Sequence, residues 1–420
     1  MDRLFGILGI IGIFAIAFAM SNNRKAINYK TVGMGFLLQV LFAIFIFKVP
    51  LGQKIFMNIG LFIQKILEFA KEGGQMVFGP LMSADFGYVF TIQLISSIIF
   101  MMILVNILYY YGIMQRVVSV LGKAINKLMA VSGAEALSNV ASAFVGQIVA
   151  QIMIRPYLAK LTRSELLASM AGSMACISGA TMPIYIGMGI PATYMLAASI
   201  MAAPGALVLT KIVYPETGTP ETSENFEITV SKRHRTHANV FDAISAGASE
   251  GMKVALNVTA MILALVALVA MLDWFLDIIG DFCVSFFNCP NMLWGIDMNN
   301  LSLKVLLGKV FAVFAYFMGV PMSEATTVGS LMGTKLVLNE MVAYVDLVNL
   351  PTQISAKSFL IASVALCSFG NLGSIAIQLG GIGELAPNQR KNLARLGVRA
   401  LICGTLTCYM SAAIVGVICS

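Results

Sequence analysis

The fold is decided by the stretch Cys367-Ser-Phe-Gly-Asn-Leu-Gly-Ser-Ile-Ala-Ile377. It lies in the middle of the apolar run 359–385, which is long enough to cross a bilayer as one helix. Its centre contains glycines and small polar residues: Gly370, Gly373, Ser368, Asn371 and Ser374. Glycine costs about 1 kcal/mol relative to alanine inside a helix, and an unpaired amide at bilayer depth costs more. This composition favours a helix that breaks at the membrane midplane to hold a ligand. Close packing of a small-residue face on a neighbouring helix is the alternative.

The composition indicates a membrane protein built from helices. Of the 420 residues, 59% are hydrophobic and 11% are charged, and windows of about 20 apolar residues recur along the chain. The net charge of +7 is typical of basic loops that face the cytoplasm and does not indicate a nucleic-acid-binding patch. Cys283 and Cys289 are the pair positioned for an external disulfide. The sequence has no phosphate-binding glycine-rich loop and no metal-ligand spacing.

Eight apolar stretches are predicted to cross the membrane. They are residues 4–20, 31–47, 90–111, 165–190, 194–213, 248–275, 359–385 and 400–419. Residues 52–69 alternate lysines with apolar residues at helical spacing, which predicts an amphipathic helix at the membrane interface or a short tilted span. Residues 304–318 are predicted as another interfacial helix or short span, and residues 387–399 as a basic loop.

Two further apolar stretches are interrupted by polar residues in a way that predicts re-entrant hairpins. Residues 133–158 begin and end beside basic residues, so a hairpin explains them better than a single crossing. Residues 321–345 have the same character. Glu135 and Glu324 occupy similar positions in these hairpins and are expected to set the hairpin geometry. Because each hairpin precedes a span rich in small residues, a hairpin followed by a broken helix occurs twice.

The distribution of basic residues supports an inverted repeat. With both hairpins re-entrant and the amino terminus outside, loops 21–31, 116–163, 211–253 and 390–399 are cytoplasmic and hold two thirds of the Lys and Arg residues. Inverted repeats with interrupted helices are typical of secondary transporters that work by alternating access; chance similarity between two spans is the alternative. The predicted fold is an all-α polytopic membrane protein with about eight transmembrane helices, two re-entrant hairpins, an interfacial helix, inverted repeats and two broken helices.

Two motifs carry a family resemblance. Asn339-Glu340-Met341-Val342-Ala343-Tyr344 resembles the Asn-Glu-Phe-Val-Ala-Tyr signature of concentrative nucleoside transporters. Phe369-Gly370-Asn371-Leu372-Gly373-Ser374-Ile375 resembles the Phe-Ala-Asn-Phe-Ser-Ser-Ile segment of the same family. The resemblance extends over essentially the whole chain. It implies a multi-pass protein of the bacterial inner membrane, in contact with the lipid bilayer, that imports nucleosides by alternating access as a proton or sodium symporter. It further implies no enzymatic activity, no organic cofactor and no nucleic-acid partner.

The resemblance also implies a homotrimer in which each protomer has a scaffold and a moving transport domain. The expected division is 1–115, scaffold helices and interfacial helix; 116–214, first half of the transport domain; 215–240, cytoplasmic linker; 241–318, scaffold helix and external loop; and 319–420, second half of the transport domain.

The resemblance assigns substrate-binding roles residue by residue. Glu340 matches the carboxylate that holds the ribose hydroxyls, Asn371 and Ser374 match polar partners of the same sugar, and Phe369 matches the aromatic residue beside it. A carboxylate is suited to this task because it accepts hydrogen bonds from two neighbouring hydroxyls. Asn339 is expected to cap the hairpin rather than to contact substrate. A structural ion pair with Lys335 is the alternative role for Glu340.

The first hairpin departs from the family pattern. Family members usually have Gly-Gln, a small polar residue and Glu, whereas this chain has Gly146-Gln147-Ile148-Val149-Ala150-Gln151. Gln147 is retained and can bond a base edge with both ends of its amide. Loss of a charge-assisted hydrogen bond costs about 1.5–3 kcal/mol, or roughly 10- to 150-fold in affinity. Three explanations stay open: the base is held differently, with Gln151 or Thr181; the ligand is a modified nucleoside or another polar molecule; or the protein transports poorly.

The positions of the family's sodium site are also altered. The resemblance places the ion between the side chains of Ser142 and Cys176 and the backbones of Val145 and Ile177. A thiol is a poor ligand for a hard cation, and Ser142 matches a serine found in proton-coupled members, so protons are favoured over sodium. Glu340 is then the remaining buried proton acceptor. A membrane receptor that keeps the fold but does not transport is the alternative from another class.

Overall fold

The computed structural model describes residues 2–82, 90–222, 238–287, 292–293, 296–298 and 301–419. The predicted linker 215–240 and Cys289 lie largely or wholly outside these ranges. The helices are α1 (Asp2–Ala19), α2 (Tyr29–Phe47), α3 (Pro50–Phe78), α4 (Phe90–Tyr110), α5 (Ile113–Met129), α6 (Gly133–Val145), α7 (Gln147–Met153), α8 (Arg155–Leu158), α9 (Arg163–Ala175), α10 (Met182–Gly187), α11 (Ala192–Val213), α12 (Val240–Phe287), α13 (Leu303–Phe317), α14 (Met322–Val337), α15 (Glu340–Val348), α16 (Ala356–Leu366), α17 (Leu372–Leu385) and α18 (Arg390–Ile418). Two short strands, β1 (Met292–Leu293) and β2 (Ile296–Asp297), pair antiparallel.

The all-α fold class is confirmed, and each of the eight predicted spans contains one helix or two. Within the described residues, α2, α11, α12 and α18 are long and apolar enough to cross a membrane on their own. Two bent pairs raise the count to six: α4 with α5, bent by 74°, and α13 with α14, bent by 118°. The remaining predicted spans correspond to the shorter helix α1 and to the broken helices α9/α10 and α16/α17.

Both predicted hairpins and both predicted breaks are present. The first hairpin turns between α6 and α7 at Gly146, whose φ of +89° favours glycine. The second turns between α14 and α15, where the Asn339 side chain caps α15 as expected. The first broken helix is interrupted between α9 and α10. The second is interrupted between α16 and α17, within the stretch 367–377.

The acidic residues at the start of each hairpin have the structural roles that were expected of them. Glu135 forms a capping box with Ser132 at the start of α6. The Glu324 carboxylate accepts from the Ser355 amide at 3.1 Å and from its hydroxyl at 2.9 Å, which links hairpin 2 to the start of α16.

Three boundaries were predicted wrongly, each for the same reason. Residues 390–399 were expected to be a loop but form the first turns of α18, and the basic segment after residue 113 forms helix α5. Helix α12 continues to Phe287, into the segment predicted as an external loop. Charged residues shorten an apolar run without necessarily ending a helix: Lys and Arg in α5 and α18 are good helix formers, and single Asp residues do not interrupt α12.

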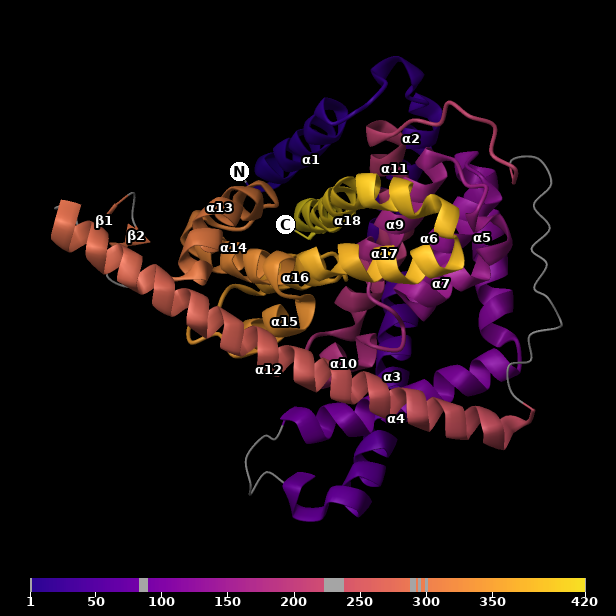
Figure 1. Ribbon diagram of the computed structural model, residues 1–420, viewed down its shortest axis with the longest axis horizontal. Coiled ribbons are helices and arrows are strands. Elements are labelled where there is room, and N and C mark those ends of the chain that lie inside the picture. Colours follow the sequence, from indigo (N-terminus) through magenta and orange to yellow (C-terminus); the bar gives the residue numbers. More distant parts are fainter. Residues whose placement is uncertain are drawn as a thin grey trace.

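Helices α4 and α12 form a pair at the edge of the molecule (Figure 1). Gly247 and Gly251 of α12 lie so close to α4 that an added Cβ would be 2.7 Å from Ile103 Cα and 2.6 Å from Ile99 Cα respectively. Small residues permit this close approach of helix backbones. In contrast, α11 and the carboxyl-terminal part of α18 are almost wholly buried, and α1 and α2 pack against α18 and α11.

Candidate functional site

The two broken helices meet each other at their interruptions. The Phe369 amide, in the second break, donates a hydrogen bond of 3.1 Å to the carbonyl oxygen of Cys176 in the first break. The tip of hairpin 1 joins the same junction, since the Gly179 amide donates to the Phe144 carbonyl at 3.1 Å. Backbone groups freed from helical hydrogen bonds are thus gathered at one place, as in the binding sites of carriers with discontinuous helices.

Glu340 is the first residue of α15 and is 7% exposed. The Tyr185 hydroxyl, from α10, donates a hydrogen bond of 3.0 Å to its Oε1. The Asn371 side chain interacts with the same carboxylate. Oε2, however, has no hydrogen-bond partner of good geometry among the described residues. The alternative ion pair is not formed: among the described residues, the fully buried Lys335 ammonium has no carboxylate oxygen within ion-pair distance and no hydrogen-bond partner.

A row of polar side chains runs along the first turns of α17. Asn371, Ser374 and Gln378 occupy positions i, i+3 and i+7 of one helix face and span about 10 Å. The Asn371 carboxamide caps the helix by accepting from the Ser374 amide at 3.0 Å, and the Ser374 hydroxyl donates to the Phe369 carbonyl. Gln378 Nε2 lies 3.5 Å from Gln147 Oε1 of hairpin 1. The row therefore extends from the Glu340 carboxylate of hairpin 2 to the Gln147 amide of hairpin 1.

These contacts place five of the predicted substrate residues, Gln147, Glu340, Phe369, Asn371 and Ser374, at one junction. The side chain of the sixth, Thr181, is hydrogen-bonded only to Ser178 among the described residues, at 3.0 Å between hydroxyls. It precedes Tyr185 by one helical turn and so lies on the same face of α10.

Sequence reasoning missed two polar residues of this junction, Tyr185 and Gln378. Both are buried, and Gln378 Oε1 has no hydrogen-bond partner in the described part of the chain. Their sequence spacing from residues already predicted to bind substrate could have identified them. Tyr185 stands four residues after Thr181, and Gln378 stands seven residues after Asn371, so each shares a helix face with a residue already singled out.

Gln151, one of the residues suggested for an altered base contact, is not at this junction. It is fully buried between α6, α7 and α9, and its amide is fully engaged by serine hydroxyls and a backbone carbonyl. Val149, two residues earlier, is 40% exposed because it faces away from this interior.

The proposed ion-site positions lie between hairpin 1 and the first break. The Ser142 hydroxyl donates to the Ser138 carbonyl at 2.8 Å, and the Cys176 thiol to the Gly172 carbonyl at 3.4 Å. The Cys176 carbonyl accepts from Phe369. One hydroxyl oxygen and one soft thiol are a poor match to the several oxygen ligands that a hard cation requires. Val145 and Ile177 contribute only backbone carbonyls.

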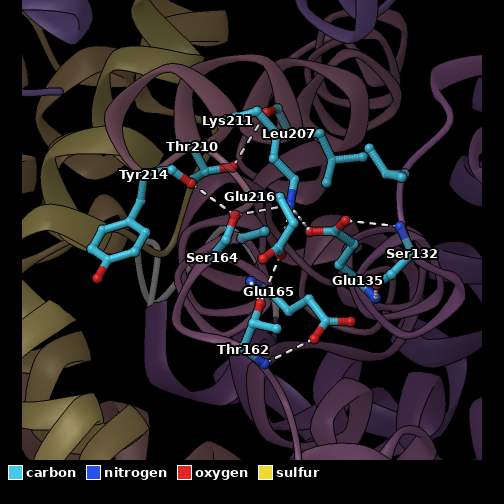
Figure 2. A network of polar contacts seen from close by, with 12 residues as sticks. Ser132, Glu135, Thr162, Ser164, Glu165, Leu207, Thr210, Lys211, Tyr214 and Glu216 are labelled. Atoms are coloured by element: carbon cyan, nitrogen blue, oxygen red, sulfur yellow. Dashed lines mark hydrogen bonds and ion pairs between the residues drawn. The ribbon is translucent and has the colours of Figure 1, made fainter. Parts of the chain in front are cut away.

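A buried ion pair anchors the root of hairpin 1 (Figure 2). Lys211, near the end of α11, lies 2.7 Å from Glu135 Oε2, and it donates to the Ser164 hydroxyl at 2.9 Å. Glu216 is 3.7 Å from the same ammonium. The Lys211 and Glu135 side chains are 7% and 1% exposed, and they line a cavity of about 380 Å³ together with residues of α2 and α5. This pair was not predicted from the sequence, because Lys211 lies at the end of an apolar span.

Re-entrant hairpins whose tips meet broken helices define a class of protein, the secondary transporters. Comparisons with known proteins specify the class further. Family models described as Na+ dependent nucleoside transporter C-terminus, Na+ dependent nucleoside transporter N-terminus and Nucleoside recognition match residues 194–416, 8–81 and 91–192. The chain belongs to the concentrative nucleoside transporter family. It is therefore grouped with multi-pass membrane transporters and not with enzymes.

The similarity to individual relatives covers nearly the whole chain. It is 40% identical to the uncharacterized transporter YutK of Bacillus subtilis, over 99% of each chain. It is 36% identical to the nucleoside permease NupC of Helicobacter pylori, over 99% of this chain and 97% of that one. Its structure resembles that of CNTnw in an inward-facing substrate-bound state with a TM-score of 0.89, at 38% identity, over 99% of this chain and 98% of that one.

Proposed function

We propose that this protein imports nucleosides across the bacterial inner membrane by alternating access, as a cation-coupled symporter without an organic cofactor. Family membership supports the substrate class. The observation that carries the proposal is a pair of buried acceptors at the junction, Glu340 Oε2 and Gln378 Oε1, which have no hydrogen-bond partner among the described residues. A buried acceptor left unpaired costs about 1–3 kcal/mol. A ligand with several hydroxyl and N–H donors, such as a nucleoside, would satisfy both.

The proposed pose follows from the row of polar side chains. Glu340 accepts from the ribose hydroxyls, while Asn371 and Ser374 bond the same sugar and the Phe369 ring packs beside it. Gln147 and Gln378, already neighbours at 3.5 Å, then hold the base edge with their amides. Thr181 adds a hydroxyl on the α10 side.

The altered first hairpin favours a second candidate substrate. Val149 is exposed, and Ile148 packs against Gly381 of α17, so this side of the site offers apolar surface where relatives offer a carboxylate. A nucleoside with a less polar or modified base fits such a surface better than an unmodified one.

The coupling ion is proposed to be a proton rather than sodium. Ser142 and Cys176, with the carbonyls of Val145 and Ile177, form a weak donor set for sodium. Glu340 is a buried carboxylate at the substrate junction and can carry a proton together with the substrate.

We further propose a homotrimer with α4 and α12 as its scaffold. Apolar residues of α12 such as Leu263, Trp274 and Leu256 are 71%, 59% and 53% exposed, so they face either lipid or another protomer. The transport domain then consists of the halves 116–214 and 319–420. Because α1 and α2, from the segment 1–115, pack on α18 and α11, these two helices are proposed to move with the transport domain.

Uptake of radiolabelled uridine and adenosine into proteoliposomes, with an imposed proton or sodium gradient, tests the proposal. We expect uptake driven by the proton gradient and its loss in Glu340→Ala. The matched control is Asp346→Ala on the same helix, which removes an ion pair with Lys304 away from the junction. Uptake that survives Glu340→Ala contradicts the ribose assignment. Binding without any uptake supports the receptor alternative.

A further inference from the structure

A cluster of five polar side chains lies between hairpin 1 and α9, and none of them belongs to the proposed substrate site. It consists of Gln151 on α7, Ser138 and Ser142 on α6, and Ser169 and Ser173 on α9. All five are fully buried. The cluster connects both arms of the hairpin to the first broken helix.

The Gln151 carboxamide is the centre of this cluster. Its Nε2 lies 2.8 Å from Ser173 Oγ, 3.2 Å from Ser138 Oγ and 3.5 Å from the Ser169 carbonyl oxygen. Its Oε1 accepts from the Ser169 hydroxyl at 2.6 Å. The Ser138 and Ser169 hydroxyls are 2.6 Å apart. Since Ser169 donates to Gln151, Ser138 must donate to Ser169, which closes a ring of hydrogen bonds through the three residues.

The remaining hydroxyl hydrogens of the cluster are also committed. The Ser173 hydroxyl donates to the Ser169 carbonyl at 2.7 Å. The Ser142 hydroxyl donates to the Ser138 carbonyl, and its oxygen lies 3.3 Å from Ser173 Oγ. Three oxygen atoms with lone pairs, Ser138 Oγ, Ser173 Oγ and the Ser169 carbonyl, therefore converge on one nitrogen. Converging oxygen lone pairs require an electropositive partner, which is either a cation or N–H donors.

We propose that the Gln151 carboxamide takes the place of a bound cation at hairpin 1, so that the hairpin docks on α9 without sodium. Ser142, at the position expected to hold sodium, belongs to the same cluster, where its hydroxyl donates to the Ser138 carbonyl at 2.8 Å and lies 3.3 Å from Ser173 Oγ. This inference deepens the proposed function and rests on it for the identity of the substrate, a nucleoside. It implies that the coupling cation does not bind at residues 138–151. Gln151 is thus a positioning residue for hairpin 1.

The first test uses the wild-type protein purified in detergent. We expect the same thermal midpoint, and the same hydrogen–deuterium exchange over residues 133–153, in sodium chloride as in choline chloride at equal ionic strength. Slower exchange or a higher midpoint specific to sodium overturns the proposal. This measurement needs no variant, so it stands even if a substitution prevents folding.

The second test uses Gln151→Glu, which keeps the shape of the side chain and replaces its N–H donors by an acceptor. In choline we expect faster exchange over hairpin 1 and a midpoint lowered by roughly 2–6 °C. Sodium should reverse part of both changes, because the oxygen cluster then lacks its electropositive centre. A variant that behaves as the wild type in choline, or that sodium does not rescue, overturns the proposal.

The matched control is Gln39→Glu. Gln39 is also fully buried and donates to a serine, Ser411, at 3.1 Å, but it joins α2 to α18 away from the hairpin. Gln39→Glu should lower the thermal midpoint, and sodium should not reverse this change. Nucleoside binding is measured in parallel. If the wild type binds no nucleoside, the proposed function fails, whereas the stability and exchange results still decide the role of Gln151 because they need no substrate.

Discussion

The Tyr185 hydroxyl donates a hydrogen bond of 3.0 Å to Glu340 Oε1, and this contact joins the two repeats of the molecule. Tyr185 belongs to the broken helix of the first repeat, whereas Glu340 belongs to the hairpin of the second. The reciprocal contact also exists, because Gln378 of the second broken helix lies 3.5 Å from Gln147 of the first hairpin. Each hairpin tip is therefore held by the broken helix of the other repeat, and a ligand at the junction contacts both repeats at once.

Tyr185→Phe is expected to weaken nucleoside binding by roughly 10- to 150-fold, since it removes one hydrogen bond to a buried charged group, about 1.5–3 kcal/mol. The ring remains, with its packing 4.8 Å from the ring of Tyr344. Isothermal titration measures the affinity. Tyr344→Phe is the control, because its hydroxyl donates to the Ser363 carbonyl and not to Glu340. Equal affinity losses in both variants contradict the assignment of Tyr185 to the site.

Lys211→Met is expected to destabilise the protein by about 3–5 kcal/mol, because it leaves the buried Glu135 carboxylate without its counter-charge. Denaturant or thermal unfolding of the purified protein measures the loss. The double variant Lys211→Met with Glu135→Gln should recover most of it, since a neutral amide needs no counter-charge and can still cap α6. A single variant as stable as the wild type would mean that the ion pair contributes nothing.

Val149→Glu is expected to strengthen the binding of unmodified uridine or adenosine by roughly 10- to 150-fold, by restoring one charge-assisted hydrogen bond. The position is 40% exposed, so the new carboxylate does not enter an apolar core. Equilibrium binding is the measurement, with Val149→Leu as the control for shape. Unchanged affinity in Val149→Glu indicates that the substrate does not reach this part of hairpin 1.

Gly381→Ala is expected to lower the free energy of unfolding by about 1–3 kcal/mol through overpacking between α17 and hairpin 1. A Cβ at Gly381 would lie 2.2 Å from Ile148 Cδ1 and 3.0 Å from its Cγ1. The adjacent Gly380 is a matched control, because an added Cβ there meets no described atom within 4 Å. Gly380→Ala should leave stability unchanged or raise it by up to about 1 kcal/mol.

A second substitution identifies the cause of the loss. Ile148→Ala in the Gly381→Ala background should restore part of the stability by making room for the new methyl group. Thermal unfolding of the four proteins measures this coupling. Equal losses in Gly380→Ala and Gly381→Ala would show that contact with Ile148 is not responsible.

Local composition was sufficient to predict the fold. The glycines and small polar residues around Asn371 placed the second break correctly, and those around Gly146 placed the turn of hairpin 1, because few other sequences tolerate a helix interruption at membrane depth. Helix α5 and the start of α18 were missed because charged helices at an aqueous surface leave no long apolar run.

The site was predictable only in part. Asn371, Ser374 and Glu340 carried recognisable motifs, whereas the Tyr185–Glu340 contact joins residues 155 positions apart and leaves no trace in local spacing. The sequence pattern also did not reveal that Val149 is exposed whereas Gln151 is buried. The rotation of α7 about its axis decides which of these two residues faces inward. Helix α7 has seven residues, which are too few to reveal that rotation through periodicity.

The buried Lys335 has an electrical consequence. It shares hairpin 2 with Glu340, so the hairpin holds one basic and one acidic buried side chain, which carry opposite charges when both are ionised. Moving one elementary charge through a membrane voltage of 100 mV is worth about 2.3 kcal/mol, and for this pair the two contributions cancel. Under the proposed symport mechanism, the membrane voltage would act on the ion that travels with the substrate, while the empty hairpin would return without electrical work.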